Sequence, residues 1–240
     1  MVSSRLRSCI VLAAVFLMFA GVSTAQTGSA ASGTGSNIKG ELDALAGGSL
    51  WGGDYGYCDN AGSGETCTKG NNTWKINVEG AVLFSLGSGR FSVGPVFGVA
   101  YRGSVPHMLT YTGEGSETYN YEDRINSLFV GGRVSVKLAD KLQLFVEAGP
   151  SVNTDRYQDN YASGGYTDNY LSNTTLTAPE EGVGLTYFAS KHIGFTVKYE
   201  RQDIRAYREV ESEGGDPYQY DTILHENGIV GGLTFWIGGR

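Results

Sequence analysis

The sequence predicts an all-β fold: an eight-stranded antiparallel up-and-down transmembrane barrel with short periplasmic turns and four long extracellular loops. Three observations predict it. Polar and apolar residues alternate with a period of two in eight segments. Short and long connections between these segments alternate strictly along the chain. Aromatic residues gather near both ends of the apolar face, as in the two girdles of membrane barrels.

The N-terminal residues predict export. Arg5 and Arg7 precede an apolar run from Cys9 to Ala20, and small residues lead up to Ala25. The run is too short to span a bilayer, so residues 1–25 are interpreted as a cleaved signal peptide. Residues 26–40 are small and polar and predict a flexible N-terminal arm. The barrel is expected over residues 41–240.

The eight predicted strands are joined by two kinds of connection. Tight turns are expected at LGSGR, ADK and ASKH, and long loops at residues 52–72, 103–123, 153–174 and 205–221. An even strand count leaves both termini on the short-turn side. Pro95 and Pro150 fall inside strands, where each removes a ladder hydrogen bond, and they predict local bulges. The strands are expected at residues 41–51, 73–86, 90–102, 124–138, 141–152, 175–188, 192–204 and 222–238.

The stretch from Trp74 to Phe84, WKINVEGAVLF, poses the question of orientation. A soluble β-sandwich would turn the apolar face toward a protein core and the charges toward water. A membrane barrel would turn the apolar face toward lipid and the charges inward. The aromatic ends of the strands, the small residues on the polar face and the alternating loop lengths favour the barrel. The predicted aromatic girdles consist of Trp74, Phe84, Phe91, Tyr101, Tyr187, Tyr199 and Phe235.

The same orientation places charged side chains inside. Seven basic residues are expected there: Lys75, Arg90, Arg102, Arg133, Lys137, Lys141 and Lys198. Seven acidic residues are expected with them: Glu41, Asp43, Glu79, Glu147, Glu180, Glu200 and Glu226. Eight strands leave room for side chains and little else, and unpaired buried charges cost several kcal/mol each. We therefore expect a closed lumen with a charge network of Lys75, Glu79, Arg102, Arg133, Glu147, Lys198, Glu200 and Glu226. Within it, Glu79, Arg133, Glu147 and Lys198 are expected to form a plug at mid-height.

Two cysteines follow the signal segment, Cys58 and Cys67, both in the first long connection. An even pair in an exported protein most often forms a disulfide, so we expect one here. Metal-spaced Cys/His sets, phosphate-binding glycine loops and nucleophile elbows are absent from the sequence, and no cofactor or metal is expected. The 25 acidic residues outnumber the 18 basic ones, which argues against nucleic-acid binding.

The long connections carry most of the tyrosines. Of the 15 Tyr, twelve are expected in loops: Tyr55, Tyr57, Tyr111, Tyr119, Tyr121, Tyr157, Tyr161, Tyr166, Tyr170, Tyr207, Tyr218 and Tyr220. Tyr mixed with Gly, Ser, Asn and acidic residues is typical of adaptable binding surfaces, whereas extracellular loops are also polar without any specific partner. Both interpretations stay open: recognition of an extracellular ligand, or a general envelope role.

The motifs VEGAVLF, GVGLTYFASKHIGFTVKYE and GIVGGLTFWIGG resemble the small eight-stranded outer-membrane barrels, the OmpA/OmpX/opacity group of the porin family. The resemblance implies a location in the bacterial outer membrane. It also implies contact with outer-membrane lipids and lipopolysaccharide, and with the barrel-assembly machinery during biogenesis. Such barrels usually end on an aromatic residue, whereas this chain continues past Phe235 and Ile237 to Gly-Gly-Arg.

The function expected from these features is non-enzymatic, serving envelope structure, surface recognition or both. Two alternatives stay open. One is a channel for small solutes. The other is a lipid A-modifying enzyme, since some barrels of this size carry that activity and the HENG motif offers His225, beside Glu226, as a general base.

Overall fold

The computed structural model describes residues 38–54, 65–69, 72–87, 89–111, 117–163, 166–210 and 218–237. The predicted signal peptide, most of the predicted arm and Cys58 lie outside these ranges. Across them, no helix is long and apolar enough to cross a membrane. The strands are β1 (Ile38–Asp54), β2 (Glu65–Lys69), β3 (Asn72–Leu86), β4 (Phe91–Arg102), β5 (Val105–Tyr111), β6 (Glu117–Ala139), β7 (Leu142–Ser163), β8 (Tyr166–Phe188), β9 (Ile193–Val210) and β10 (Tyr218–Ile237).

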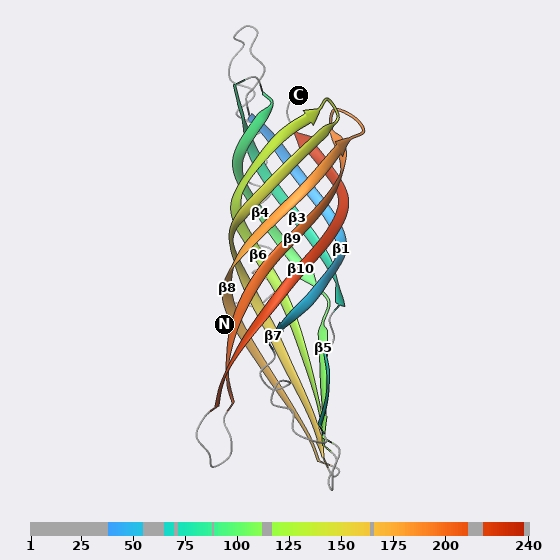
Figure 1. Cartoon of the computed structure of the whole chain (residues 1–240), viewed down its shortest axis with the longest axis vertical. Coiled ribbons are helices and arrows are strands. Elements are labelled where there is room, and N and C mark those ends of the chain that lie inside the picture. The colour runs from blue at the N-terminus through green and yellow to red at the C-terminus, as the bar shows by residue number, and fades with distance from the viewer. Residues whose placement is uncertain are drawn as a thin grey trace.

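Eight of these strands close into a barrel, as the sequence predicts (Figure 1). Their order is β6-β4-β3-β1-β10-β9-β8-β7, and the pairing of β6 with β7 completes the circle. Neighbours in the barrel are antiparallel throughout. The two short strands lie outside the circle: β5 pairs with the first residues of β6, and β2 pairs with β5.

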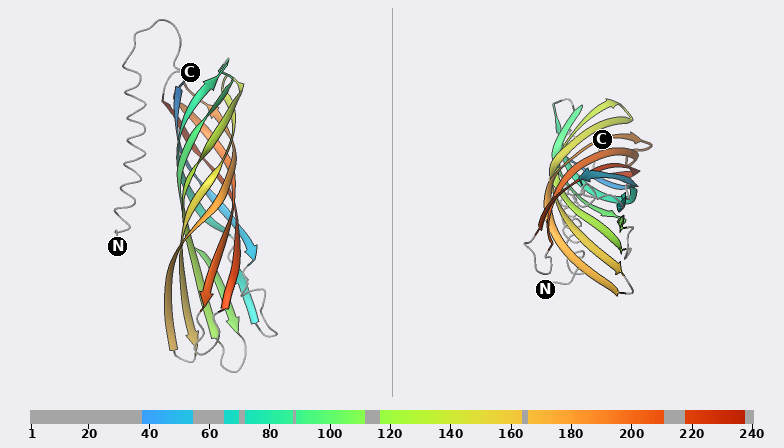
Figure 2. Two further views of the ribbon diagram at one scale, coloured as in Figure 1. Left: turned by 90° about the vertical axis from the view of Figure 1, so that its left-hand side faces the viewer. Right: turned by 60° about the horizontal axis from the view of Figure 1, so that its bottom comes forward.

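The register explains the oblique course of the strands in Figures 1 and 2. Opposed residues followed once around the barrel from Asn227 in β10 lead back to the same strand at Ile237, ten residues further along. A closed barrel of eight strands with such a stagger requires the strands to tilt by about 40°. The resulting lumen is narrow enough to be filled by side chains.

The two faces of each strand differ as predicted. In β3 the side chains of Lys75, Asn77 and Glu79 are buried, while those of Trp74 and Ile76 are exposed. All seven predicted girdle residues are exposed on the outer face, from Phe235 at 37% to Trp74 at 57%. Because the buried face is polar and charged and the exposed face is apolar, the barrel is the reverse of a soluble β-sandwich.

The three tight turns lie where the sequence places them. Between β3 and β4, Gly87 and Gly89 have φ angles of 56° and 76°, which glycine adopts without steric cost. Between β8 and β9, the backbone amide of Ile193 donates to the Ser190 hydroxyl at 3.1 Å. These turns fix the register from which the lumen-facing positions are counted.

Two expectations about backbone irregularity were wrong. The predicted long loops 103–123, 153–174 and 205–221 are largely strand, because their Tyr- and Thr-rich residues pair across each hairpin. Pro95 and Pro150 do not produce bulges. The β3–β4 ladder skips the residues around Pro95, and the β6–β7 ladder skips those around Pro150, but the register is the same on both sides of each gap.

Candidate functional site

A single arginine in the lumen forms ion pairs with four carboxylates. Arg133 of β6 is fully buried and donates to the carboxylates of Glu41 and Asp43 at 2.7 Å each, from Nη1. Its Nη2 lies 2.8 Å from both Glu79 and Glu147. The guanidinium also lies 4.3 Å from the centre of the Phe145 ring. Four carboxylates from β1, β3 and β7 therefore converge on one cation, and each strand is fixed relative to the others.

Lys198 extends this cluster toward the end of the barrel opposite the tight turns, which is called the long-strand end below. Its ammonium group forms ion pairs with Glu79 and Glu147, and lies 3.2 Å from Glu200. Glu200 in turn pairs with Lys75 and accepts a hydrogen bond from Asn77 at 2.7 Å. Glu200 thus joins two cations from β9 and β3.

A second centre lies on Glu226 of β10. Arg102 donates to both of its carboxylate oxygens, at 2.6 Å each, which is the bidentate geometry that arginine favours. Lys75 donates to the same carboxylate at 3.0 Å and Ser49 at 2.5 Å. The structure therefore brings all eight residues of the predicted network together, in one connected series from Arg133 to Arg102.

Glycines make room for these long side chains. A Cβ atom at Gly98 would lie 2.9 Å from Glu79, and one at Gly228 would lie 2.8 Å from the carboxylate of Glu200. At Gly184 a Cβ would lie 2.2 Å from the tip of the Phe145 ring. The inward-facing glycines thus define the shape of the lumen as much as the charged residues do.

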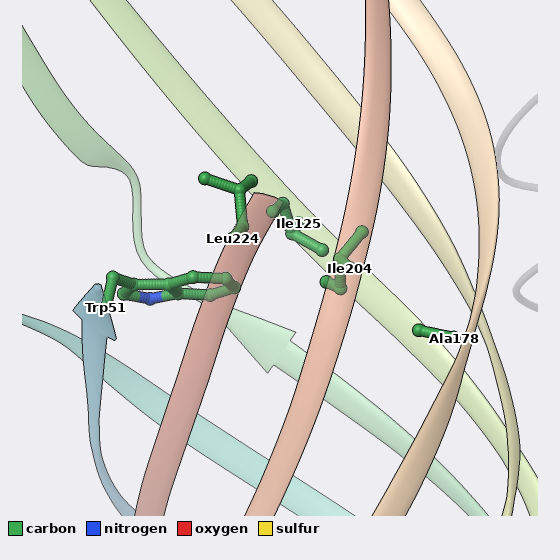
Figure 3. Packing of buried hydrophobic residues seen from close by; sticks show 5 residues of the cluster. All are labelled: Trp51, Ile125, Ala178, Ile204 and Leu224. Atoms are coloured by element: carbon green, nitrogen blue, oxygen red, sulfur yellow. The ribbon is translucent and has the colours of Figure 1, made fainter. Parts of the chain in front are cut away.

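Two apolar clusters accompany the network, and neither was predicted from the sequence. Toward the long-strand end, five buried side chains from five strands form a cluster: Trp51, Ile125, Ala178, Ile204 and Leu224 (Figure 3). The guanidinium carbon of Arg102 lies 5.9 Å from the Trp51 ring, so this layer covers the network directly. A second cluster contains Ala81, Leu83, Val96 and Phe129. Their inward positions follow from the strand alternation, which could have identified them.

The predicted balance of seven basic and seven acidic lumen residues is wrong. Arg90, Lys137 and Lys141 are exposed at the short turns, because they lie at strand ends where the side chain reaches solvent. Asp155, which was assigned to a loop, is buried. Among the described residues, the buried basic side chains are Lys75, Arg102, Arg133 and Lys198. The buried acidic ones are Glu41, Asp43, Glu79, Glu147, Asp155, Glu180, Glu200 and Glu226. The lumen therefore holds a surplus of carboxylates.

The HENG motif is divided between the two faces of β10. Glu226 is fully buried in the lumen network, while His225 faces outward and its Nδ1 lies 2.6 Å from Asp203 Oδ1. Asp203 lies four residues beyond the girdle residue Tyr199, outside the membrane-spanning part of β9. The hydrogen bond with His225 lowers the pKa of the Asp203 carboxyl. His225 and Glu226 thus cannot act on the same bound molecule.

The strands extend beyond the barrel on one side. β2, β5, β6, β7 and β8 continue as one sheet, in which Tyr119 is opposite Tyr161 and Tyr170 is opposite Asp159. One group of tyrosine positions is an even number of residues away from the lumen-facing positions of the same strand, or is paired with such a position. These positions are 111, 119, 121, 157, 161, 166 and 170.

Some predicted features are not described by the structure. For Cys67 only the backbone pairing with Leu109 is described, so the predicted disulfide with Cys58 stays a prediction. Within the described part of the chain, no group of three or more His, Cys, Asp or Glu side chains is placed to hold a metal ion.

Comparison with solved structures identifies the fold. The outer membrane protease OmpT from Escherichia coli matches with a TM-score of 0.50 and 11% identity, covering 87% of this chain and 99% of that chain. The attachment invasion locus protein Ail of Yersinia pestis matches with a TM-score of 0.45 and 13% identity, covering 84% of this chain and 99% of that chain. OprG from Pseudomonas aeruginosa matches with a TM-score of 0.45 and 11% identity, covering 86% and 99%.

The sequence matches no family model and no curated protein. At such low identities the likeness shows the fold alone, that of a bacterial outer-membrane β-barrel. Because proteins that share this fold differ in role, the fold does not decide between an enzyme and a non-enzymatic protein.

Proposed function

We propose that this protein is a non-enzymatic integral outer-membrane barrel with a closed lumen, acting through the strands and loops at its outer end. The observation that carries the proposal is the connected network from Arg133 through Lys198 and Glu200 to Arg102. Side chains from opposite walls meet in it, and the Trp51 layer covers its outer end. A solute entering from outside would have to displace the Trp51 layer and then the ion pairs of the charge network.

The closed lumen distinguishes the proposal from a diffusion channel. Breaking a buried ion pair by removing one partner costs about 3–5 kcal/mol, so opening a path through several such pairs is unfavourable. Planar-bilayer recording of the refolded protein tests this directly. We expect no stable conductance of general-porin size, and a steady open level of that size would refute the closed lumen.

The proposal of recognition at the outer end is supported by the extended sheet. Seven tyrosine positions share one phase of its alternation, and tyrosine supplies rigid amphipathic contact area at low entropic cost. We expect purified protein to bind candidate host or matrix surfaces. Replacing Tyr119 and Tyr161 together with Ser is expected to reduce that binding, whereas the same change at the girdle residue Tyr187 is expected to leave it intact. Equal binding by both variants would leave only the envelope role.

The division of HENG between two faces supports the non-enzymatic assignment. The carboxylate that orients His225 is Asp203, and the neighbouring Glu226 is engaged with Arg102 inside the lumen. Mass spectrometry of lipid A from cells with and without the protein tests the assignment. We expect an identical acylation pattern, and a changed pattern would establish lipid A modification.

A further inference from the structure

The end of the barrel that carries the tight turns is basic, although the whole chain has a net charge of −7. Five lysine and arginine residues lie in these turns or close to the strand ends beside them: Lys39, Arg90, Lys137, Lys141 and Lys191. Apart from the carboxylates that surround Arg133, Asp140 is the one acidic side chain among the described residues of this end. Such a concentration of positive charge favours an anionic partner.

Three of the basic residues line a small cavity at the opening of the lumen, at the end where β10 terminates (Figure 1). They are Lys39, Arg90 and Lys137, and the acidic residue of the lining is Asp140. Three positive charges against one negative charge leave an excess of two positive charges around the cavity. Its volume of about 30 Å³ admits small polar groups, such as the oxygen atoms of an oxyanion, and excludes a large organic molecule.

The inner wall of the same cavity holds polar atoms that have no partner within the protein. Ser135 Oγ, Gln143 Nε2 and Trp236 Nε1 are buried without a hydrogen bond, and all three residues line the cavity. The residues are 2%, 7% and 5% exposed, respectively. Each lies an even number of residues from a lumen-facing charge of its own strand, so the three side chains face the lumen. Because amide and indole nitrogens can only donate, the cavity wall lacks an acceptor.

Trp236 is held against this cavity by two neighbours. Its ring packs edge-on against Phe188, with the ring centroids 5.1 Å apart and an interplanar angle of 85°. The Lys39 ammonium nitrogen lies 5.3 Å from the centre of the Trp236 ring. Phe188 and Lys39 also line the cavity, so a hydrogen-bond donor and a positive charge lie beside the same small space.

A phosphate group suits these features better than water or a monovalent anion does. Water can accept hydrogen bonds from the donors, but it does not compensate two positive charges. A phosphate group with one ester bond carries about −1.5 to −2 charges at pH 7 and has three strong acceptor oxygens. Inorganic phosphate offers the same chemistry.

We propose that the cavity at the tight-turn opening of the lumen binds a phosphate group, with its oxygen atoms toward Gln143 and Trp236 and its charge toward Arg90 and Lys137. The site lies at the end of the barrel opposite the tyrosine-bearing sheet, and it does not depend on the function proposed for that sheet.

The experiment is a titration of inorganic phosphate into the refolded, isotope-labelled full chain in dodecyl maltoside, a detergent without phosphate. Binding is followed by NMR through the indole N–H resonances. The chain has three tryptophans, and Trp236→Phe identifies the resonance of Trp236. We expect this resonance to shift saturably, while those of Trp51 and Trp74 stay unchanged. Sodium chloride at equal ionic strength is expected to cause no saturable shift.

Two matched variants separate the cavity from the general charge of this end. Lys137→Gln changes an exposed side chain that lines the cavity, and we expect it to weaken phosphate binding about twofold to fivefold, the range for one exposed charge. Lys191→Gln removes an exposed charge at the same end that does not line the cavity, and it should bind like the parent protein. The absence of a saturable Trp236 shift would show that water alone occupies the cavity. An equal response to chloride, or equal weakening by both variants, would show only diffuse attraction. Each of these results would overturn the proposal.

A second titration distinguishes the source of the phosphate group. Phosphatidic acid is added to the micelles in place of inorganic phosphate, at matched phosphate concentration. A Trp236 shift at lower concentration of phosphatidic acid than of inorganic phosphate would assign the site to a lipid head group. A shift with inorganic phosphate alone would assign it to the free anion. Both results support a phosphate site.

Discussion

Arg133 Nη2 lies 2.8 Å from Glu79 Oε2, although their strands are not neighbours in the barrel. β4 separates β6 from β3, and it contributes Gly98 opposite Glu79, where a side chain would occupy the same space. The ion pair therefore passes over the inner face of β4 at Gly98, where β4 has no side chain. Such transverse contacts, in addition to the backbone ladder, fix the shape of the barrel.

Removing the central cation is expected to be strongly destabilising. Arg133→Met would leave Glu41, Asp43, Glu79 and Glu147 without their common partner, and we expect the free energy of unfolding to fall by about 3–5 kcal/mol. Urea unfolding in lipid vesicles measures the loss.

A compensating variant separates this charge effect from simple loss of packing. Adding Glu79→Gln and Glu41→Gln to Arg133→Met removes two of the stranded charges, and we expect it to recover part of the stability. If the triple variant were less stable than Arg133→Met alone, uncompensated burial of charge would not be the cause.

The shape of the lumen is tested at a glycine. Gly184→Ala would bring a Cβ atom to 2.2 Å from the Phe145 ring, which is buried against Arg133. Overpacking of this kind costs about 1–3 kcal/mol, measured by the same unfolding experiment. Gly132→Ala is the control, because no atom lies within 4 Å of its Cβ position, and a change within about 0.5 kcal/mol is expected. Equal effects at the two positions would contradict the packing argument.

The positions that the sequence predicted well are those counted from tight turns. Arg133, Glu147 and Lys198 each lie a few residues from a short turn, so strand alternation and turn position together determined both their face and their height. The same alternation did not predict that the side chains of Arg90 and Lys141 are exposed to solvent, because it does not show at which residue a strand extends beyond the lumen. It also assigned Asp155 to a loop, because the outer strands are polar on both faces.

Two other features depend on three-dimensional pairing. The apolar layer of Trp51, Ile125 and Ile204 requires knowing that these positions, far apart in sequence, lie at the same height. The end of the β8–β9 ladder also requires such knowledge, because both strands continue beyond the last pair, Glu180 and Gln202.

The predicted disulfide can be tested without structural knowledge of its loop. Denatured, unreduced mature protein should show no free thiol toward a maleimide reagent, and reduction should release two, from Cys58 and Cys67. In the chain-entropy model a loop of this size is stabilised by about 2–3 kcal/mol, which would order the first connection more than the barrel. Two free thiols before reduction would exclude the bond.

The orientation of the apolar face toward lipid is tested by placing a charge on it at two depths. Val197 is 60% exposed and lies two residues from the girdle residue Tyr199 toward the tight turn, whereas Leu50 is 54% exposed near the end of β1. In lipid vesicles Val197→Arg is expected to cost about 2–4 kcal/mol, because the guanidinium would enter the hydrocarbon, and Leu50→Arg only about 0–1 kcal/mol. An outer face that met water would tolerate arginine equally at both positions. A depth-independent effect in vesicles would therefore contradict the membrane orientation, since the two side chains have nearly the same exposure.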